Sequence, residues 1–197
     1  MSKPYSGSCD QNKDSILSVI SPLLLTHSTV LEIGSGTGQH AVHFAENMPH
    51  LRWYTSDCAP YLDGIKMWLD EAGLSNTVSP FELNVSTSKW PELEVDAIFT
   101  ANTLHIMPFA DVVNFFSGVG ELLEPGGNLL IYGPFNYNGS YTSESNERFD
   151  HWLKSREPLS CIKHFEEINT LANNRGLQLI SDEAMPANNR ILYFLKV

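Results

Sequence analysis

Residues 30–40 read Val-Leu-Glu-Ile-Gly-Ser-Gly-Thr-Gly-Gln-His, a short apolar strand that runs into glycines at positions 34, 36 and 38. Because glycine has no Cβ and tolerates positive φ, this spacing predicts a tight turn whose backbone a nucleotide-like ligand can touch. A dinucleotide-binding fingerprint, G-x-G-x-x-G, needs glycine at position 39, where this chain has Gln39. A phosphate-binding P-loop needs a lysine directly after the glycines, and none follows.

The pattern that remains is E-x-G-x-G-x-G, formed by Glu32, Gly34, Gly36 and Gly38. In many methyltransferases such a loop holds S-adenosylmethionine (SAM), a ligand without phosphate and so without need of a P-loop lysine. Asp57 follows 19 residues after Gly38, where a carboxylate can accept both hydroxyls of an unphosphorylated ribose. The sequence therefore indicates SAM as cofactor, with S-adenosylhomocysteine (SAH) as the product.

Composition limits the class of protein. The chain has 197 residues, of which 42% are hydrophobic and 18% charged, so we expect one globular domain over residues 1–197. A formal charge of -11 disfavours nucleic acid as a partner, since binding to phosphate backbones depends on Lys and Arg. No apolar run is long enough for a membrane span, and we expect a cytoplasmic protein without membrane association.

The cysteines predict neither disulfides nor a metal site. Cys9, Cys58 and Cys161 are odd in number and widely separated, without C-x-x-C spacing. We expect free thiols and no metal, and the sequence leaves the oligomeric state open.

Hydrophobic periodicity predicts strands alternating with helices over the first two thirds of the chain. The expected strands are 30–33, 51–56, 78–83, 95–101 and 128–133, with helices at 16–25, 41–48, 61–72 and 112–123 between or before them. Such alternation is typical of a parallel α/β sheet with right-handed crossovers.

The last third has a different pattern. Residues 134–145 lack periodicity and predict a long loop, followed by helices near 146–154 and 165–172. Two final strands, 177–183 and 191–197, are joined closely enough for a hairpin. The sequence thus predicts an α/β, three-layer Rossmann-like class I methyltransferase fold, whose seven-stranded, mostly parallel sheet has one antiparallel strand near the C-terminus.

Ligands of such sheets bind at the carboxyl ends of the strands. The cofactor-binding candidates at these ends are Glu32, Gly34, Gly36, Gly38, Asp57, Asn84, Val85 and Asn102. Asn84 can reach the adenine amino group, and Glu32 would lie near the methionine part. His105, after the fourth strand, is the candidate base or substrate-orienting group, because an imidazole with a pKa near ~6.5 can accept a proton near neutral pH.

Further sequence blocks resemble a known family. They are Asn-Thr-Leu-His-Ile (102–106), Tyr-Gly-Pro-Phe (132–135), Ser-Asn (145–146) with Phe-Asp (149–150), and Met-Pro-Ala-Asn-Asn (185–189). With the glycine loop they resemble the methyltransferase-like 26 family, catalogued as domain of unknown function 938. The resemblance implies a SAM-dependent methyltransferase fold with an unidentified acceptor.

The resemblance also implies further site residues. The family begins its first helix with Arg-Asn where this chain has Gln11-Asn12. The resemblance makes Asn12 a candidate cofactor contact. In class I folds the last hairpin lies near the acceptor, so one polar cavity is expected from Asn102, His105, Tyr132, Asn136, Asn146, Asp150 and Asn188. Of these, His105, Asn102, Tyr132, Asp150 and Asn188 are the catalytic candidates.

Two classes of function remain open at this point. The first is a SAM-dependent methyltransferase that acts on a small molecule. The alternative is a non-catalytic sensor or regulatory module that binds SAM or a related nucleoside. Gln39 disfavours a third possibility, an NAD(P) dehydrogenase.

Overall fold

The computed structural model describes residues 2–197, and its contacts divide the chain into two compact units, Met1–Thr100 and Ala101–Val197. We call them the N-terminal and the C-terminal unit. The N-terminal unit is built from strands and helices in alternation, as the periodicity predicts, and the C-terminal unit ends in two successive strands.

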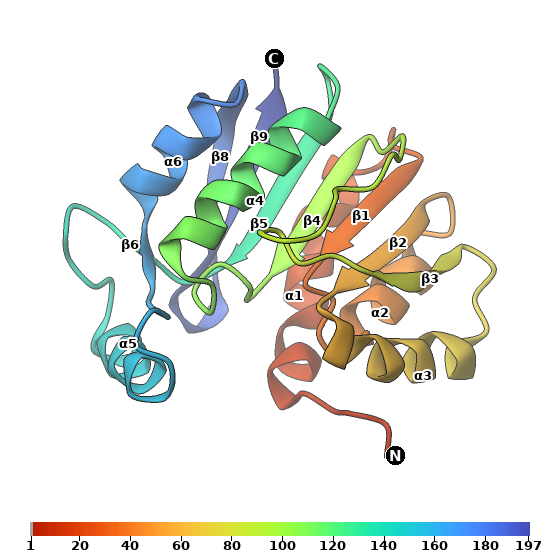
Figure 1. Ribbon diagram of the computed structural model, residues 1–197, viewed down its shortest axis with the longest axis horizontal. Coiled ribbons are helices and arrows are strands. Elements are labelled where there is room, and N and C mark those ends of the chain that lie inside the picture. The colour runs from red at the N-terminus through yellow and green to blue at the C-terminus, as the bar shows by residue number, and fades with distance from the viewer. Residues whose placement is uncertain (1) are drawn as a thin grey trace. The chain divides into compact units, whose positions relative to one another are not determined.

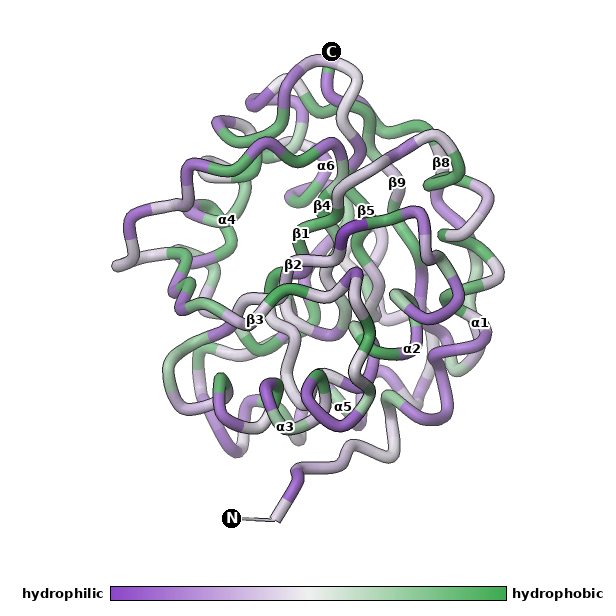
Figure 2. Tube along the Cα trace, turned by 90° about the vertical axis from the view of Figure 1, so that its right-hand side faces the viewer, coloured by the Kyte–Doolittle hydropathy of each residue, from purple (hydrophilic) through white to green (hydrophobic). Residues whose placement is uncertain are grey.

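The N-terminal unit contains four parallel strands, labelled in Figure 1: β1 (Thr29–Ile33), β2 (Arg52–Asp57), β3 (Thr77–Glu82) and β4 (Ala97–Ala101). β1 pairs with β2 on one side and with β4 on the other, and β3 pairs with β2. Ala97, Ile98 and Phe99 of β4 are fully buried, and Figure 2 shows this strand largely in the green of hydrophobic residues. Such continuous apolar runs are typical of parallel strands covered on both faces.

The helices of this unit are α1 (Gly7–Leu23), α2 (Gln39–Asn47) and α3 (Leu62–Ala72), with a short 3-10 turn, η1 (Ala59–Tyr61), before α3. α2 contacts both α1 and α3. α1 begins nine residues earlier than its apolar stripe predicted, because the Ser6 hydroxyl caps it by accepting a hydrogen bond from Cys9 N at 3.3 Å. The aromatic core between these layers includes Phe44, Trp53 and Phe99.

The C-terminal unit contains α4 (Phe109–Leu122), α5 (Glu144–Arg156), α6 (Phe165–Asn173) and the strands β5 (Asn128–Gly133), β8 (Leu177–Met185) and β9 (Asn189–Lys196). β9 runs antiparallel to both β5 and β8, and the turn η2 (Pro186–Asn188) joins β8 to β9. Figure 1 shows α4 and α6 on one face of these strands.

The strand order is β3-β2-β1-β4-β5-β9-β8. The expected Rossmann-like, seven-stranded and mostly parallel sheet with one antiparallel strand near the C-terminus is therefore confirmed. The expectation of an irregular loop over 134–145 was incomplete, since Phe135–Asn136 form β6, which pairs in parallel with β7 (Lys163–His164). Two-residue strands have no periodicity that a sequence pattern could reveal.

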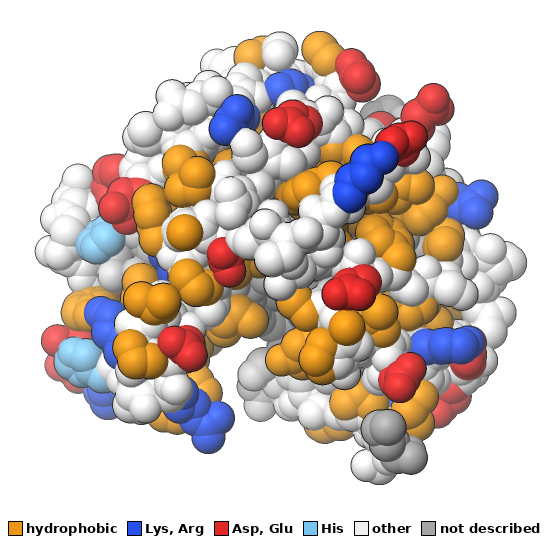
Figure 3. All heavy atoms as spheres, in the orientation of Figure 1, with side chains coloured by type: hydrophobic (Ala, Val, Ile, Leu, Met, Phe, Trp, Pro, Cys, Tyr) orange, Lys and Arg blue, Asp and Glu red, His pale blue; other side chains and the backbone are white. Residues whose placement is uncertain are grey.

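Charged side chains of both signs are interspersed on the face that Figure 3 shows. None of the three cysteines forms a disulfide within residues 2–197. In that same range, every helix is too short or too polar to cross a bilayer.

Candidate functional site

The glycine loop joins β1 to α2 in the N-terminal unit. Gly34, Gly36 and Gly38 have φ values of 75°, 60° and 89°, in the left-handed region that favours glycine. A Cβ on Gly38 would lie 3.1 Å from the Cα of Ile65, whereas a Cβ on Gly36 would meet nothing within 4 Å. Gly38 therefore lets the loop pack against α3, and Gly36 leaves open space beside the backbone.

Asp57, at the end of β2, holds this loop directly. Its Oδ2 accepts a hydrogen bond from Gly36 N and its Oδ1 accepts one from Cys58 N, both at 2.7 Å. Burial raises the pKa of Asp57, although these two bonds counteract the rise. The structure thus brings together the acid and the glycines that the sequence placed 19 residues apart.

Three further amides of the loop donate hydrogen bonds within the protein. Gly34 N and Ser35 N both donate to Ser56 O at 3.0 Å, and Gly38 N donates to Ser35 O at 2.9 Å. What these glycines offer a ligand is therefore close approach to the backbone rather than spare N–H donors.

Glu32 is buried beneath the loop, with 1% of its surface exposed. Trp53 Nε1 donates to its Oε2 at 3.0 Å. Burial raises the pKa of Glu32 to about 7, with the nearby Asp57 carboxylate adding to the rise and the Trp53 hydrogen bond opposing it. Near neutral pH this carboxyl is therefore divided between its protonated and ionised forms.

Asn12 of α1 lies against α2, where its Oδ1 is 2.7 Å from His40 Nε2. Burial lowers the pKa of His40 to about 4, so its ring is neutral and Nε2 carries the proton that it donates to Asn12. Gln39, the residue that excluded a dinucleotide fingerprint, accepts from Ser6 N at 2.6 Å and from Thr37 Oγ1 at 3.0 Å. It therefore ties the start of α1 to the glycine loop, a role that the sequence pattern did not reveal.

Asn84 and Val85 follow β3. The Oδ1 of Asn84 accepts from Ser86 N at 3.0 Å, which closes a local turn, and Val85 is buried. One lone pair of this amide oxygen is thus used by the turn and the other is left for a ligand.

Asn102 opens the C-terminal unit in a left-handed conformation with φ of 57°. Its backbone N donates to Tyr132 O at 2.9 Å, which ties Asn102 to β5 within this unit. Tyr132 itself is 3% exposed. Positive φ at a non-glycine residue is uncommon and concentrates at functional sites.

His105 is buried next to Phe149, whose ring it meets edge-on with 5.2 Å between centroids. Burial, and after it the positive charge of Lys163, lowers the pKa of His105 to about 4. The sequence-based expectation used the unperturbed value near ~6.5. In the structure His105 is a neutral group that can donate or accept a hydrogen bond at pH 7, but a weak base.

Asp150 of α5 has both carboxylate oxygens engaged. Its Oδ1 accepts from Ile162 N at 2.7 Å, and its Oδ2 accepts from Tyr141 Oη at 2.7 Å and Lys154 Nζ at 2.6 Å. Burial alone would raise the pKa of Asp150, but these donors outweigh it and hold the pKa below its usual value. The residue ties α5 to the segment that leads into β7.

Asn188 lies on the exposed hairpin turn with φ of 58°. Its Nδ2 donates to Ser145 Oγ at 3.2 Å, and its carbonyl accepts from Asn146 Nδ2, also at 3.2 Å. These bonds fasten the hairpin to the start of α5.

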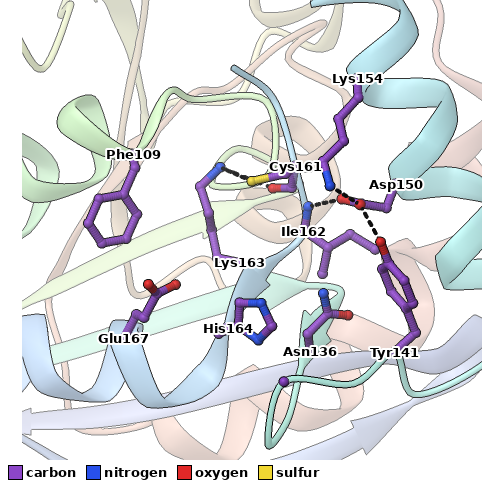
Figure 4. Close-up of a pocket in the computed structure, with 11 residues that line it drawn as sticks. Phe109, Asn136, Tyr141, Asp150, Lys154, Cys161, Ile162, Lys163, His164 and Glu167 are labelled. Atoms are coloured by element: carbon purple, nitrogen blue, oxygen red, sulfur yellow. Dashed lines mark hydrogen bonds and ion pairs between the residues drawn. The ribbon is translucent and has the colours of Figure 1, made fainter. Parts of the chain in front are cut away.

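A cavity of about 360 Å³ opens within the C-terminal unit (Figure 4). It includes two members of the polar set expected from the resemblance, Asn136 and Asp150, whereas Asn102, His105, Tyr132, Asn146 and Asn188 do not line it. Lys163, which the sequence did not single out, lies near the centre of the labelled side chains. Within residues 2–197, no group of three or more His, Cys, Asp or Glu side chains is arranged to hold a metal ion.

A family model described as protein of unknown function (DUF938) matches residues 3–196. The chain is also similar to the SAM-dependent methyltransferase SibL in its apo form, with a TM-score of 0.80 and 20% identity over 95% of this chain and 55% of that one. For human N-acetylserotonin methyltransferase in complex with SAM, the TM-score is 0.79 with 14% identity, over 96% of this chain and 52% of that one.

An O-methyltransferase family 2 protein from Planctomyces limnophilus, in complex with apigenin, gives a TM-score of 0.76 and 14% identity over 94% of this chain and 62% of that one. The chain therefore spans little more than half the length of the solved proteins that it resembles. At these identities the similarity is one of fold.

Proposed function

The chain belongs to the DUF938 family of proteins of unknown function, and from this membership and its fold we propose that it is a SAM-dependent methyltransferase acting on a small molecule. The observation that carries the proposal is the bond between the Asp57 carboxylate and Gly36 N in a left-handed glycine loop. Solved proteins of the same fold support it, since one is named SAM-dependent and another is complexed with SAM.

The loop suits a ligand without phosphate. Gly36 leaves space that a Cβ would fill, and no Lys or Arg lies in residues 30–40 to pair with a phosphate. Each Asp57 oxygen accepts one backbone N–H and keeps a second lone pair for a ribose hydroxyl. Gly34, Gly36, Gly38 and Asp57 would thus hold the nucleoside part of the cofactor.

Five further residues are proposed cofactor contacts. Asn84 and Val85 would contact the adenine, with Asn84 using the free lone pair of its Oδ1. Asn12, Asn102 and Glu32 complete the proposed set. Glu32 is buried beneath the loop, and the charge of its carboxyl depends on pH. When bound, SAM supplies an electrophilic methyl group.

The proposed acceptor residues are His105, Asn102, Tyr132, Asp150 and Asn188. Their role would be to orient the acceptor, because methyl transfer is an in-line displacement in which positioning contributes most. The lowered pKa of His105 favours orientation through a hydrogen bond over removal of a proton. A single domain over residues 1–197, a cytoplasmic location and kinship to methyltransferase-like 26 stay predictions of the sequence.

Turnover tests the proposal. The protein is incubated with SAM whose methyl group is deuterated, together with pooled small-molecule metabolites, and SAH and labelled products are followed by mass spectrometry. We expect SAH to accumulate with one labelled product, and the Asp57→Asn variant to slow its formation. SAH binding with no turnover in any pool would contradict the enzymatic role and favour a SAM sensor.

A further inference from the structure

The cavity in the C-terminal unit has the size of a ligand site. Its volume of about 360 Å³ falls within the range of ~300–1,000 Å³ that small-molecule pockets occupy. Its lining combines apolar side chains, such as Phe109 and Ile162, with Asn136, Lys163 and Glu167. A few polar groups in a partly apolar cavity are what fixes the orientation of a bound molecule.

The buried side-chain oxygen of Asn136 has no hydrogen-bond donor among the described residues. Its side chain is 5% exposed, and its Oδ1 accepts no hydrogen bond from any residue that the structure describes. In Figure 4 its carboxamide lies between the side chains of His164 and Tyr141 at the cavity. An unsatisfied buried acceptor costs about 1–3 kcal/mol, so a donor from a ligand would remove a real penalty.

Lys163 supplies a buried positive charge that forms no ion pair with any described side chain. It is 2% exposed, and its Nζ donates to Met107 O at 2.7 Å and to Cys161 O at 3.0 Å. Throughout residues 2–197, no carboxylate lies within 4.0 Å of this ammonium group. Burial lowers the pKa of Lys163, and the opposing contributions of Cys161, Asp150 and Glu167 do not offset this shift.

Asp150, the buried acid of the same lining, does not supply that counter-charge. Its Oδ2 is held by Lys154 at 2.6 Å and by Tyr141 at 2.7 Å. Lys154 and Asp150 therefore neutralise each other, which leaves one positive charge at the cavity's inner wall. The remaining carboxylate, Glu167, is exposed.

We propose that this cavity binds a small organic acid that carries a hydroxyl or amino group. Its carboxylate lies toward Lys163, its O–H or N–H donates to Asn136 Oδ1, and its apolar body packs against Phe109 and Ile162. The inference does not depend on methyl transfer, because it rests on residues of the C-terminal unit alone.

Three probes separate the two proposed contacts. 4-Hydroxybenzoate carries a carboxylate and a hydroxyl group, and tyrosine carries a carboxylate, a hydroxyl group and an amino group. Benzoate carries only the carboxylate. Binding to the full chain without SAM is measured by calorimetry and by saturation-transfer NMR. We expect 4-hydroxybenzoate or tyrosine to bind at least ~5-fold more tightly than benzoate, as one hydrogen bond of about 1 kcal/mol requires.

Variants assign the contacts. Asn136→Leu should reduce the affinity for the better probe to that for benzoate, and Lys163→Met should abolish binding of all three. Glu167→Gln, which removes the exposed negative charge at the cavity, should tighten binding. Glu183→Gln, the same change on β8 outside the cavity, should leave affinity unaltered.

Circular dichroism and thermal unfolding check each variant. If Lys163→Met does not fold, since its Nζ holds two backbone carbonyls, the comparison of Glu167→Gln with Glu183→Gln decides the charge contact. The proposal is overturned if no probe binds at millimolar concentration, or if Asn136→Leu binds like the unaltered protein. SAH binding, measured in parallel, distinguishes this failure from a failure of the proposed methyltransferase function.

Discussion

The carboxylate of Asp57 accepts a hydrogen bond from the backbone nitrogen of Gly36 at 2.7 Å. This contact joins the end of β2 to the loop that follows β1, and it positions an acid beside a stretch of backbone without side chains. An acid and a glycine loop so arranged can hold a ribose and the atoms next to it.

Replacing Asp57 by Asn should weaken SAH binding. The variant keeps the side chain's size but loses the charge and one acceptor, and hydrogen bonds to a charged group contribute about 1.5–3 kcal/mol. Calorimetry should therefore give a Kd roughly 10- to 150-fold higher. Asp70→Asn, an exposed position near the end of α3 paired with Lys66, makes the same change of charge and should leave Kd unchanged. Equal affinities in the two variants would remove Asp57 from the site.

Gly38→Ala should destabilise the protein more than Gly36→Ala. Both glycines have positive φ, which costs an L-residue about 1–2 kcal/mol. At Gly38 the new Cβ also lies 3.1 Å from Ile65 Cα and 3.2 Å from Ile65 O, whereas at Gly36 it meets nothing within 4 Å. Urea unfolding should show this order, and a larger loss of stability for Gly36→Ala would show that the loop packs differently.

Gly36→Ala should weaken SAH binding, because its methyl group enters the space proposed for the ligand.

Glu32 should make folding stability depend on pH. Its pKa is about 7 in the folded chain against 4.5 for an unperturbed carboxyl, so the folded state holds the proton more tightly. Its contribution is present below pH 4.5 and is lost as the pH rises to about 7, by about 3 kcal/mol in total.

The variant Glu32→Gln tests this dependence, because it can still accept the Trp53 hydrogen bond but does not titrate. The free energy of unfolding of the variant minus that of the unaltered protein should be larger at pH 8 than at pH 5, because only the unaltered protein loses the contribution of Glu32 as the pH rises. The same difference at both pH values would show that Glu32 keeps an ordinary pKa.

His105 should stay neutral well below pH 6.5. With a folded pKa of about 4, its contribution to stability is present above pH 6.5 and is lost as the pH falls toward 4. Nitrogen-15 NMR of the histidine rings, assigned with a His105→Asn variant, should show a neutral imidazole at pH 5.5. A titration midpoint between pH 6 and 7 would instead support His105 as a general base.

The main fold was predictable because its signals are local. β1, β4 and β5 have apolar runs, α2, α3 and α4 have 3.6-residue stripes, and the glycines at 34, 36 and 38 mark the first crossover. The proximity of Asp57 to the loop followed too, since parallel strands end at the same edge of a sheet.

The C-terminal site was less predictable, because it depends on contacts between distant segments. Lys163 follows Cys161 and Ile162 in a segment without a recognisable motif. Only the pairing of β6 with β7 brings it next to the segment of Asn136. The resemblance made Asp150 a catalytic candidate, but in the structure its carboxylate accepts from three donors, which belong to α5, residue 141 and residue 162. The lowered pKa of His105 likewise depends on burial, which no spacing reveals.

The measurement that tests the central claim most directly is a calorimetric titration of SAH into the unaltered, folded protein. The account predicts saturable binding at one site, which SAM competes for and NAD does not. No heat up to millimolar SAH, with circular dichroism confirming the fold, would contradict it.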